Sequence, residues 1–260
     1  MAADLTAAAE RLERRPNRPQ DGRVFPETRL SVVARAVGAD PKQRAASLEL
    51  LARSYYRPIY AHLRCKWRLS ATDAEDMTQA FFVSVAERDV FASFSPERAR
   101  FRTFVRACVD HLAEDELRAK TRLKRGGGKK HVSFDFTGVE SAIGPTVGSA
   151  ADDAFDREWT RVLVSMGIEE LKTRLAAAGK ARYFTVFERF DLAPDARPSY
   201  AAIAEELSIS VYDVTNYLHA ARKELKRAIA DQLRNLTASE AELREEAEAL
   251  GMTKMIGRLK

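Results

Sequence analysis

The sequence predicts an all-α protein in which an N-terminal helical bundle and a C-terminal helix-turn-helix domain are joined by a flexible linker. Three observations support this prediction. Apolar residues recur at spacings of three and four over most of the chain, which is the period of a helix with one buried face. A glycine-containing segment, residues 126–154, interrupts that pattern. Two short, capped helical segments then follow each other closely between residues 200 and 227.

The composition is typical of a water-soluble globular protein. Hydrophobic residues make up 45% and charged residues 31% of the 260 positions. No apolar run approaches the ~20 residues that cross a bilayer, and the N-terminus lacks the apolar core of a secretory signal. Two cysteines are too few for a disulfide framework, so we expect a reducing cytoplasm. The net charge of +5 favours a polyanionic partner.

The N-terminal part divides into an arm and a helical domain. Residues 1–28 are rich in proline and charge and predict a poorly ordered arm, whereas residues 29–125 predict a bundle of four helices. Pro41 directly after Asp40 marks the start of one helix. Thr72 and Glu75 have the spacing of a capping box and mark the start of another. The last helix carries one apolar stripe, formed by Phe101, Phe104, Val105, Cys108, Val109 and Leu112.

The C-terminal part begins after the predicted linker, residues 126–154. Helical periodicity resumes over residues 155–236, which we interpret as the helix-turn-helix domain. Residues 237–260 form an extension that is acidic up to Glu248 and basic at its end. The linker contains too little apolar sequence to bury much, so the sequence predicts two helical modules on a tether.

Residues 199–227 carry the local signals of a helix-turn-helix. Ser199 and Ser210 are predicted N-caps, and Asp213 completes a reciprocal cap with Ser210. Small Ala204 allows the two helices to approach closely, and Ser208 stands at the turn, where glycine is often preferred. A helix lying in the major groove would present polar side chains to base edges and phosphates. On the second helix these are Tyr212, Thr215, Asn216, His219, Arg222 and Lys223. The alternative is an ordinary helical hairpin with a solvated face.

A second basic region lies in the N-terminal part. Between residues 98 and 130 there are eleven lysines and arginines against four acids, and Phe91, Phe94, Phe101 and Phe104 lie just upstream or among them. Basic side chains neutralise phosphates and aromatic rings stack on exposed bases, so this region favours a nucleic-acid surface. The alternative is that the phenylalanines are core and the charges a solvated face; we expect Phe104 to be core and the loop 94–100 to be functional. The polar face of Asp73, Glu75, Asp76 and Gln79 suggests a docking patch for a protein.

These residues resemble a known family, the bacterial sigma factors of the extracytoplasmic-function group within the sigma-70 family. The resemblance covers about residues 48–233 and omits both terminal extensions. The run Asp73-Ala74-Glu75-Asp76-Met77-Thr78-Gln79-Ala80-Phe81-Phe82, the runs Phe94-Ser95-Pro96-Glu97-Arg98 and Phe101-Arg102-Thr103-Phe104, and the run Glu114-Asp115-Glu116-Leu117-Arg118 are similar to sigma region 2. Residues 199–225 are similar to sigma region 4.

The resemblance implies a dissociable subunit that directs RNA polymerase to promoters and itself carries out no catalysis. Glu75, Asp76 and Gln79 would bind the coiled coil of the polymerase β′ subunit, and region 4 would meet the β flap. The −10 element of the promoter would be held by Phe94, Arg98, Arg100, Phe101, Arg102, Arg106, Arg118 and Arg122. The second helix of the helix-turn-helix would read the −35 element, although Thr215 and Tyr217 stand where many relatives carry lysine or arginine. An anti-sigma protein would be a further partner, and the location would be the bacterial cytoplasm and nucleoid.

Two other functions remain open from the sequence: a stand-alone helix-turn-helix repressor or activator, and a protein-interaction adaptor. An enzyme is not expected, because the sequence carries no nucleophile-elbow, metalloprotease or dinucleotide-binding motif. Gly126-Gly127-Gly128-Lys129-Lys130 lacks the spacing of a phosphate-binding loop. His62, Cys65, Cys108 and His111 could supply a Cys₂His₂ zinc site, but Cys108 lies on the apolar stripe. We expect neither a metal nor another cofactor.

Overall fold

The computed structural model describes residues 36, 41–88, 90–122, 150–193 and 197–251. Within these ranges the chain forms eight α helices and one 3₁₀ helix and contains no strand, so the predicted all-α class is confirmed. The expected N-terminal arm, most of the expected linker and the end of the C-terminal extension lie outside the described residues. No helix among the described residues has both the length and the apolar character needed to cross a membrane.

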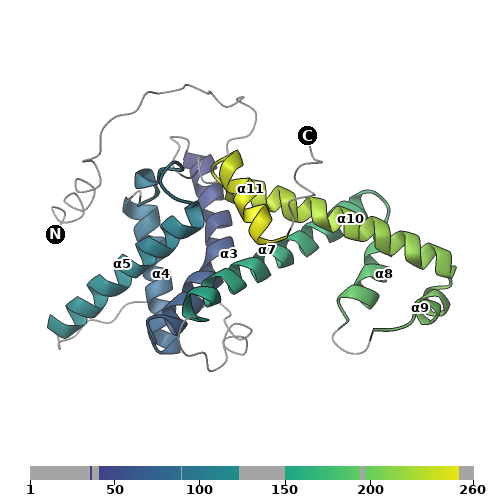
Figure 1. The fold of residues 1–260 in the computed structure, drawn as a ribbon, viewed down its shortest axis with the longest axis horizontal. Helices are drawn as coiled ribbons and strands as arrows, with labels where there is room; N and C mark the ends of the chain where they lie inside the picture. Colours follow the sequence, from purple (N-terminus) through teal and green to yellow (C-terminus); the bar gives the residue numbers. More distant parts are fainter. Residues whose placement is uncertain (1–35, 37–40, 89, 123–149, 194–196, 252–260) are drawn as a thin grey trace, which may run out of the picture.

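Helices α3, α4 and α5 form one end of the molecule, together with the short 3₁₀ helix η1 (Figure 1). Their bounds are Pro41–Cys65 for α3, Ala71–Arg88 for α4, Val90–Ser93 for η1 and Phe101–Arg122 for α5. Helix α3 begins at Pro41 as predicted. The apolar stripe of α5 is confirmed at its centre, because Phe101, Val105 and Val109 are fully buried.

The predicted start of α4 was wrong by two residues. Ser70, not Thr72, is the N-cap, because its hydroxyl accepts a hydrogen bond of 3.1 Å from the backbone N–H of Asp73 and donates one of 2.8 Å to the Asp73 carboxylate. Thr72 is exposed within the first turn. Ser70 and Thr72 both have side chains that can cap a helix. The helix already begins at Ala71, so Thr72 lies inside the first turn and Ser70 takes the N-cap position.

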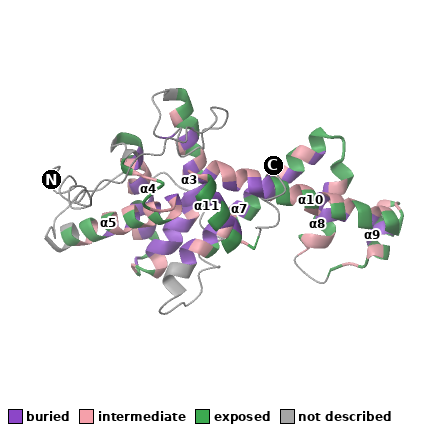
Figure 2. Ribbon diagram, turned by 45° about the horizontal axis from the view of Figure 1, so that its top comes forward, coloured by how far each residue is buried: buried purple, intermediate pink, exposed green. Residues whose placement is uncertain are grey.

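Two long helices connect the ends of the molecule. Helix α7 (Ala150–Ala177) lies along α3, and α10 (Val211–Leu236) lies along α7 (Figure 1). The first turns of α7 and the last turns of α10 are part of the N-terminal core, as is α11 (Glu240–Ala249), which follows α10. Buried residues run continuously through this region (Figure 2). They include Phe155, Trp159 and Leu163 from α7, Ile229, Leu233 and Leu236 from α10, and Leu243 and Ala247 from α11.

The structure therefore differs from the tethered arrangement in one respect. The sequence boundary expected between residues 154 and 155 does not coincide with a break in packing, because apolar residues on both sides of it share one core. Periodicity along one helix reports which face is apolar, and it does not report which partner covers that face. The apolar face at the start of α7 packs against α3, and the end of α10 packs against α7 and α11.

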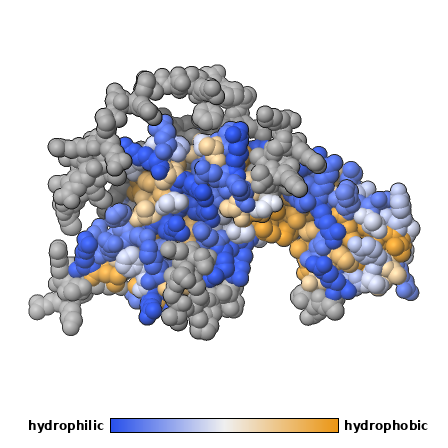
Figure 3. Space-filling model, viewed as in Figure 1, coloured by the Kyte–Doolittle hydropathy of each residue, from blue (hydrophilic) through white to orange (hydrophobic). Residues whose placement is uncertain are grey.

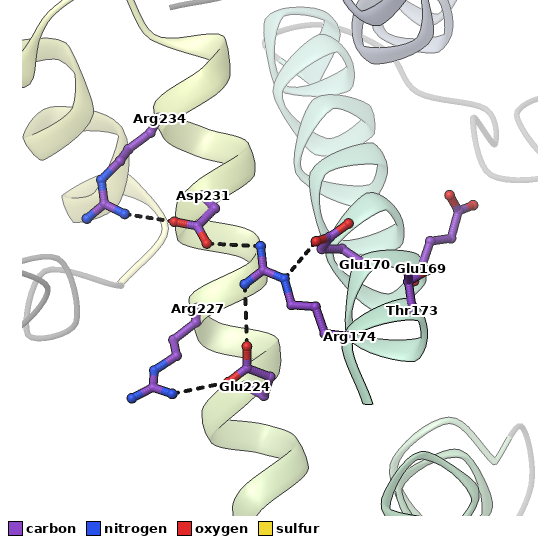
Figure 4. A network of polar contacts seen from close by, with 8 residues as sticks. All are labelled: Glu169, Glu170, Thr173, Arg174, Glu224, Arg227, Asp231 and Arg234. Carbon is purple, nitrogen blue, oxygen red and sulfur yellow. Dashed lines mark hydrogen bonds and ion pairs between the residues drawn. The ribbon is translucent and has the colours of Figure 1, made fainter. Parts of the chain in front are cut away.

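A network of charged side chains ties the end of α7 to the second half of α10 (Figure 4). Arg174 of α7 bonds Glu170 at 2.7 Å within its own helix and reaches Asp231 of α10 at 3.0 Å. A third carboxylate, that of Glu224 on α10, lies 3.4 Å from the Arg174 guanidinium and also pairs with Arg227. A planar guanidinium with several donors suits such a multiple contact better than a lysine would. The network helps to fix the rotation of the two helices about their contact.

A second, smaller core lies at the other end of the molecule. It is formed by the end of α7, α8 (Ala181–Asp191), α9 (Tyr200–Leu207) and the first half of α10. Tyr183 of α8 stacks on Tyr217 of α10 with ring centroids 4.0 Å apart. In the space-filling view, hydrophilic residues cover much of the visible surface, and orange apolar areas lie along α7 and α10 toward this end (Figure 3). This core holds α9 and α10 as one unit.

Candidate nucleic-acid interface

Helices α9 and α10 form a helix-turn-helix whose local geometry follows the sequence closely. The Ser199 hydroxyl accepts a hydrogen bond of 3.1 Å from Ala202 N–H and caps α9, as predicted. Ser208 ends α9 in the left-handed conformation with φ 52° and ψ 51°, which is why glycine would suit this position. The joint between the helices is therefore only three residues long, Ser208, Ile209 and Ser210.

The predicted reciprocal cap at the start of α10 is confirmed. Asp213 N–H donates to the Ser210 hydroxyl at 3.0 Å, and Ser210 N–H donates to the Asp213 carboxylate at 3.1 Å. The Ser210 hydroxyl also bonds that carboxylate, and these bonds lower the pKa of Asp213. Such a cap fixes the direction of the first turn of α10. The first turn is the part of a recognition helix that enters a groove most deeply.

The outer face of α10 is exposed over its first four turns. Tyr212 is 75% exposed and Val211 48% exposed, although both are large and apolar in part. Thr215, Asn216, His219 and Lys223 are exposed as well, so the structure brings five of the six predicted −35 residues onto one open face. The opposite face is buried through Val214, Leu218 and Ala221. The face thus combines hydrogen-bonding groups, a cation and an aromatic ring.

Arg222, the sixth predicted residue, has a different environment. Its guanidinium donates two hydrogen bonds to the Asp191 carboxylate, of 2.7 and 2.8 Å, and lies 5.6 Å from the Phe190 ring. This pair joins α10 to the end of α8. Sequence reasoning missed Asp191 because the two residues are 31 positions apart and neither belongs to a local motif. In the structure Arg222 therefore fixes α10 to α8.

The aromatic loop between α4 and α5 forms a compact cluster. Phe94 contacts Phe101 and Phe104 with centroid distances of 5.1 and 5.2 Å, and Phe91 contacts Phe101 at 5.1 Å. Phe101 is completely buried, so its ring supports the loop from inside. Phe94 and Phe104 are half-buried. The prediction that Phe104 is core is met only in part, and Phe94 is partly exposed.

The predicted −10 arginines divide into three groups. Arg98 and Arg118 are exposed and Arg106 is half-buried, and Arg118 pairs with Glu114 one turn earlier. Arg100 and Arg102 instead face carboxylates of α11 and α7, with Arg102 only 13% exposed in its side chain. The side chain of Arg122 lies outside the described residues. The ion pairs of Arg100 and Arg102 with these carboxylates are the main feature that the sequence did not indicate.

The predicted polymerase-binding residues lie on α4. Asp76 is exposed, whereas Glu75 and Gln79 are half-buried. Beneath them, Tyr56 of α3 stacks on Phe82 at 5.7 Å. Burial raises the pKa of Tyr56 to about 12; a hydrogen bond with Gln79 opposes the rise, and the charges of Glu75 and Asp76 add to it. The acidic face of α4 therefore lies over the stacked rings of Tyr56 and Phe82.

The four residues considered for zinc do not come together as a set. His62 is buried, and its Nε2 lies 2.7 Å from an oxygen of Asp110, while its ring meets Phe155 edge-on at 5.9 Å. His111 is exposed. Burial raises the pKa of the Cys108 thiol to about 11. Over the part of the chain that the structure describes, no three His, Cys, Asp or Glu side chains are arranged to hold a metal ion.

The His62 contact belongs instead to a structural cluster around Asp110. The Asp110 carboxylate also accepts hydrogen bonds of 2.8 Å from Lys66 Nζ and Trp67 Nε1. Burial alone would raise the pKa of Asp110, but the bonds from His62, Lys66 and Trp67 outweigh it and hold the pKa well below its usual range. This cluster fastens α5 to the end of α3.

The fold and these surfaces define an all-helical protein with a helix-turn-helix at one end and a basic, aromatic loop at the other. Comparison of the chain with protein-family models, with curated proteins and with solved structures gives no match. The function is therefore inferred from the surfaces themselves and from the resemblance in the sequence.

Proposed function

We propose that the chain is a sigma-type initiation factor, which binds core RNA polymerase and directs it to promoter DNA. The observation that carries this proposal is the open polar face of α10, presented by a capped helix-turn-helix. That face alone would support any duplex-binding protein. The basic, aromatic loop and the acidic face of α4 favour a protein that also opens DNA and binds the polymerase.

The first step in the proposal is duplex recognition by α10. Asn216 has the amide geometry that pairs with adenine in the major groove, and the exposed Tyr212 ring offers apolar contact to a thymine methyl group. Lys223, further along the helix, is placed for a phosphate. The polymerase would carry out the chemistry, and this chain would direct it to the promoter sequence.

The second step is capture of the opened strand at the aromatic loop. An unstacked base exposes both its edge and its face, and the partly exposed ring of Phe94 would provide a surface on which that face stacks. Arg98 and Arg106 lie on the same loop and on the following helix, where they neutralise the adjoining phosphates. Among the described residues, neither arginine forms an ion pair that would have to break first.

The third step is attachment to the polymerase through α4. The resemblance places Glu75, Asp76 and Gln79 against the β′ coiled coil, and the exposed carboxylate of Asp76 suits a basic partner surface. Charge at the rim of an interface acts mainly on the rate of association and on specificity. Reversal of the Asp76 charge is therefore a direct probe of this contact.

The experiment is to mix the purified chain with core polymerase from its own source, isolate the complex and select bound duplexes from a random DNA library. The proposal expects a stable complex and an enriched motif. Asp76→Arg should weaken polymerase binding at least tenfold, which corresponds to about 1.4 kcal/mol. Glu87→Arg is the matched control, because Glu87 is an exposed acid further along α4. Duplex selection without any polymerase binding would instead identify a stand-alone helix-turn-helix regulator.

A further inference from the structure

Helix α11 packs against the start of α5 and against Arg100, which directly precedes it. Its apolar side is buried through Leu243 and Ala247, which are 2% and 1% exposed. Two glutamates on the same helix, Glu242 and Glu246, are buried with them. A helix with four glutamates in its first seven residues is expected to keep them in water. The burial of two of them requires partners on the surface beneath.

Glu242 is held by backbone groups. Its carboxylate accepts a hydrogen bond of 2.6 Å from the N–H of Phe101, the first residue of α5, and one of 2.8 Å from Ala238 N–H. The first N–H groups of a helix have no partner within the helix, and an acidic group is favoured there. Glu242 thus links the C-terminal helix to the N-terminus of α5 across 141 positions of sequence.

Glu245 and Glu246 lie on the two arginines that precede and follow Phe101. Arg100 Nε donates to Glu245 at 2.7 Å, and Arg102 Nη2 lies 2.9 Å from Glu246. The other terminal nitrogen of Arg102 donates to Asp156 of α7 at 2.9 Å, and its guanidinium lies 4.7 Å from the Trp159 ring. Three carboxylates therefore surround two guanidinium groups, in the way that consecutive phosphates of a nucleic acid would.

The contact is costly to maintain. Glu246 is 1% exposed, and neither of its oxygens has a hydrogen bond of good geometry, so the arginine charges hold it without full compensation. Burial raises the pKa of Glu246, and Arg102 and Arg100 oppose that rise. Removal of paired charges from water costs free energy that their attraction does not always return. A contact of this kind is suited to opening.

We propose that α11 is an autoinhibitory cover, which occupies the nucleic-acid surface of Arg100 and Arg102 with its own carboxylates and must leave before that surface binds a DNA strand. This inference rests on the proposed function, because it takes the start of α5 as a DNA surface. A protein that binds a ligand only in its open state has an apparent affinity equal to the affinity of the open state multiplied by the fraction of molecules that are open. If about one molecule in ten is open, affinity for the strand is about tenfold weaker than the open state allows.

The test measures binding of the full-length chain to a fluorescein-labelled single-stranded oligodeoxythymidine at low salt, without polymerase. The release variant is Glu245→Lys with Glu246→Lys, which places positive charges against Arg100 and Arg102. The matched control is Glu240→Lys with Glu248→Lys, because these glutamates are exposed on the same helix and the change in net charge is identical. We expect the release variant to bind at least about fivefold more tightly than the control.

Two additions separate release of α11 from a general charge effect. Arg100→Ala with Arg102→Ala, placed in the release variant, should abolish the gain in affinity. Leu243→Glu, which places a charge in the buried side of α11, should bind more tightly than wild type and should speed hydrogen exchange of the α11 amides. The inference would be overturned if the double lysine variant bound no more tightly than its control and Leu243→Glu bound no more tightly than wild type. A gain that survives loss of the two arginines would overturn it as well.

The result is independent of the polymerase experiment. If the chain does not bind polymerase but the release variants gain affinity for the strand, the proposed function fails and the cover remains. If the chain binds polymerase through Asp76 and the release variants gain nothing, the cover fails and the proposed function remains.

Discussion

Gly167 of α7 faces Ile229 of α10 so closely that a Cβ atom on Gly167 would overlap Ile229 Cγ1 and lie 3.5 Å from Ile229 Cα. The two long helices therefore touch backbone to side chain at this position. The Arg174 network lies further along the same contact (Figure 4). Together they set the position of the helix-turn-helix relative to the N-terminal core.

Gly167→Val should destabilise the protein by about 1–3 kcal/mol, because the added methyl groups overpack a contact that has no space for them. Urea denaturation followed by circular dichroism measures the change. Ser165→Val is the matched control, since Ser165 is exposed on the same helix and valine has the same helix propensity at both positions. Equal destabilisation by the two variants would show that the helices do not meet at Gly167.

Asp110→Asn should lower the free energy of unfolding by about 1–3 kcal/mol at neutral pH, because Lys66 and Trp67 lose a charged acceptor. The depressed pKa of Asp110 gives this effect a pH dependence. The native state holds the ionised form more tightly than the unfolded state, so the stabilisation is present above the ordinary pKa of 3.8 and is lost as the pH falls below it.

The measurement is the difference in unfolding free energy between wild type and Asp110→Asn from neutral pH down to about pH 3. The difference should be constant at neutral pH and shrink at the acidic end. A difference that grows on acidification would contradict the assignment of Asp110 as an ionised acceptor.

Asn216→Ala and Arg222→Ala should have different effects on duplex binding. Loss of the Asn216 amide should cost about 1–3 kcal/mol at one base position of the selected motif and leave stability unchanged. Arg222→Ala should instead lower the thermal stability, because Asp191 loses its partner. Binding to variant duplexes, compared with thermal denaturation of each protein, distinguishes the two. Base-specific loss from Arg222→Ala with no change in stability would place Arg222 in the interface instead.

Docking of α11 should weaken as the pH rises. The pKa values of Glu242 and Glu246 are raised by burial when α11 is docked, so the docked state binds protons more tightly than the released state. Docking is then favoured fully below the ordinary pKa of 4.5 and loses free energy as the pH rises through the raised values. The charged or titratable groups facing them are Arg100, Arg102, Asp156, Glu245 and Tyr55.

Hydrogen-exchange protection of the α11 amides, corrected for the intrinsic rate, should be greater at about pH 5 than at about pH 7.5. Glu242→Gln with Glu246→Gln should flatten this dependence. Protection that increases with pH in the wild type would show that the arginine pairs, and not desolvation, dominate the contact.

The parts of the structure that the sequence predicted are local. The N-caps at Ser199 and Ser210 depend on residues within three positions, and the helical periods depend on neighbouring turns. The exposed face of α10 follows from the same periodicity. The cap of α4 was misplaced because Ser70 and Thr72 both have suitable side chains, and only the path of the preceding backbone decides between them.

The parts that the sequence did not predict are long-range. Nothing local indicates that Asp191 pairs with Arg222, or that Glu242 reaches Phe101. The sequence of the extension indicated only that it is acidic up to Glu248. One signal was present: Ser239 is an N-cap, and Leu243 and Ala247 are four residues apart, which together indicate a short amphipathic helix. The surface that such a helix covers depends on tertiary packing, which periodicity does not encode.

The most direct test of the proposed function is a single-round transcription assay with core polymerase, the purified chain and a promoter carrying the motif selected in the binding experiment. The account predicts transcripts from that promoter only when the chain is present, and their loss with Asp76→Arg but not with Glu87→Arg. Transcription that is independent of the chain, or a chain that binds the motif without recruiting polymerase, would contradict it.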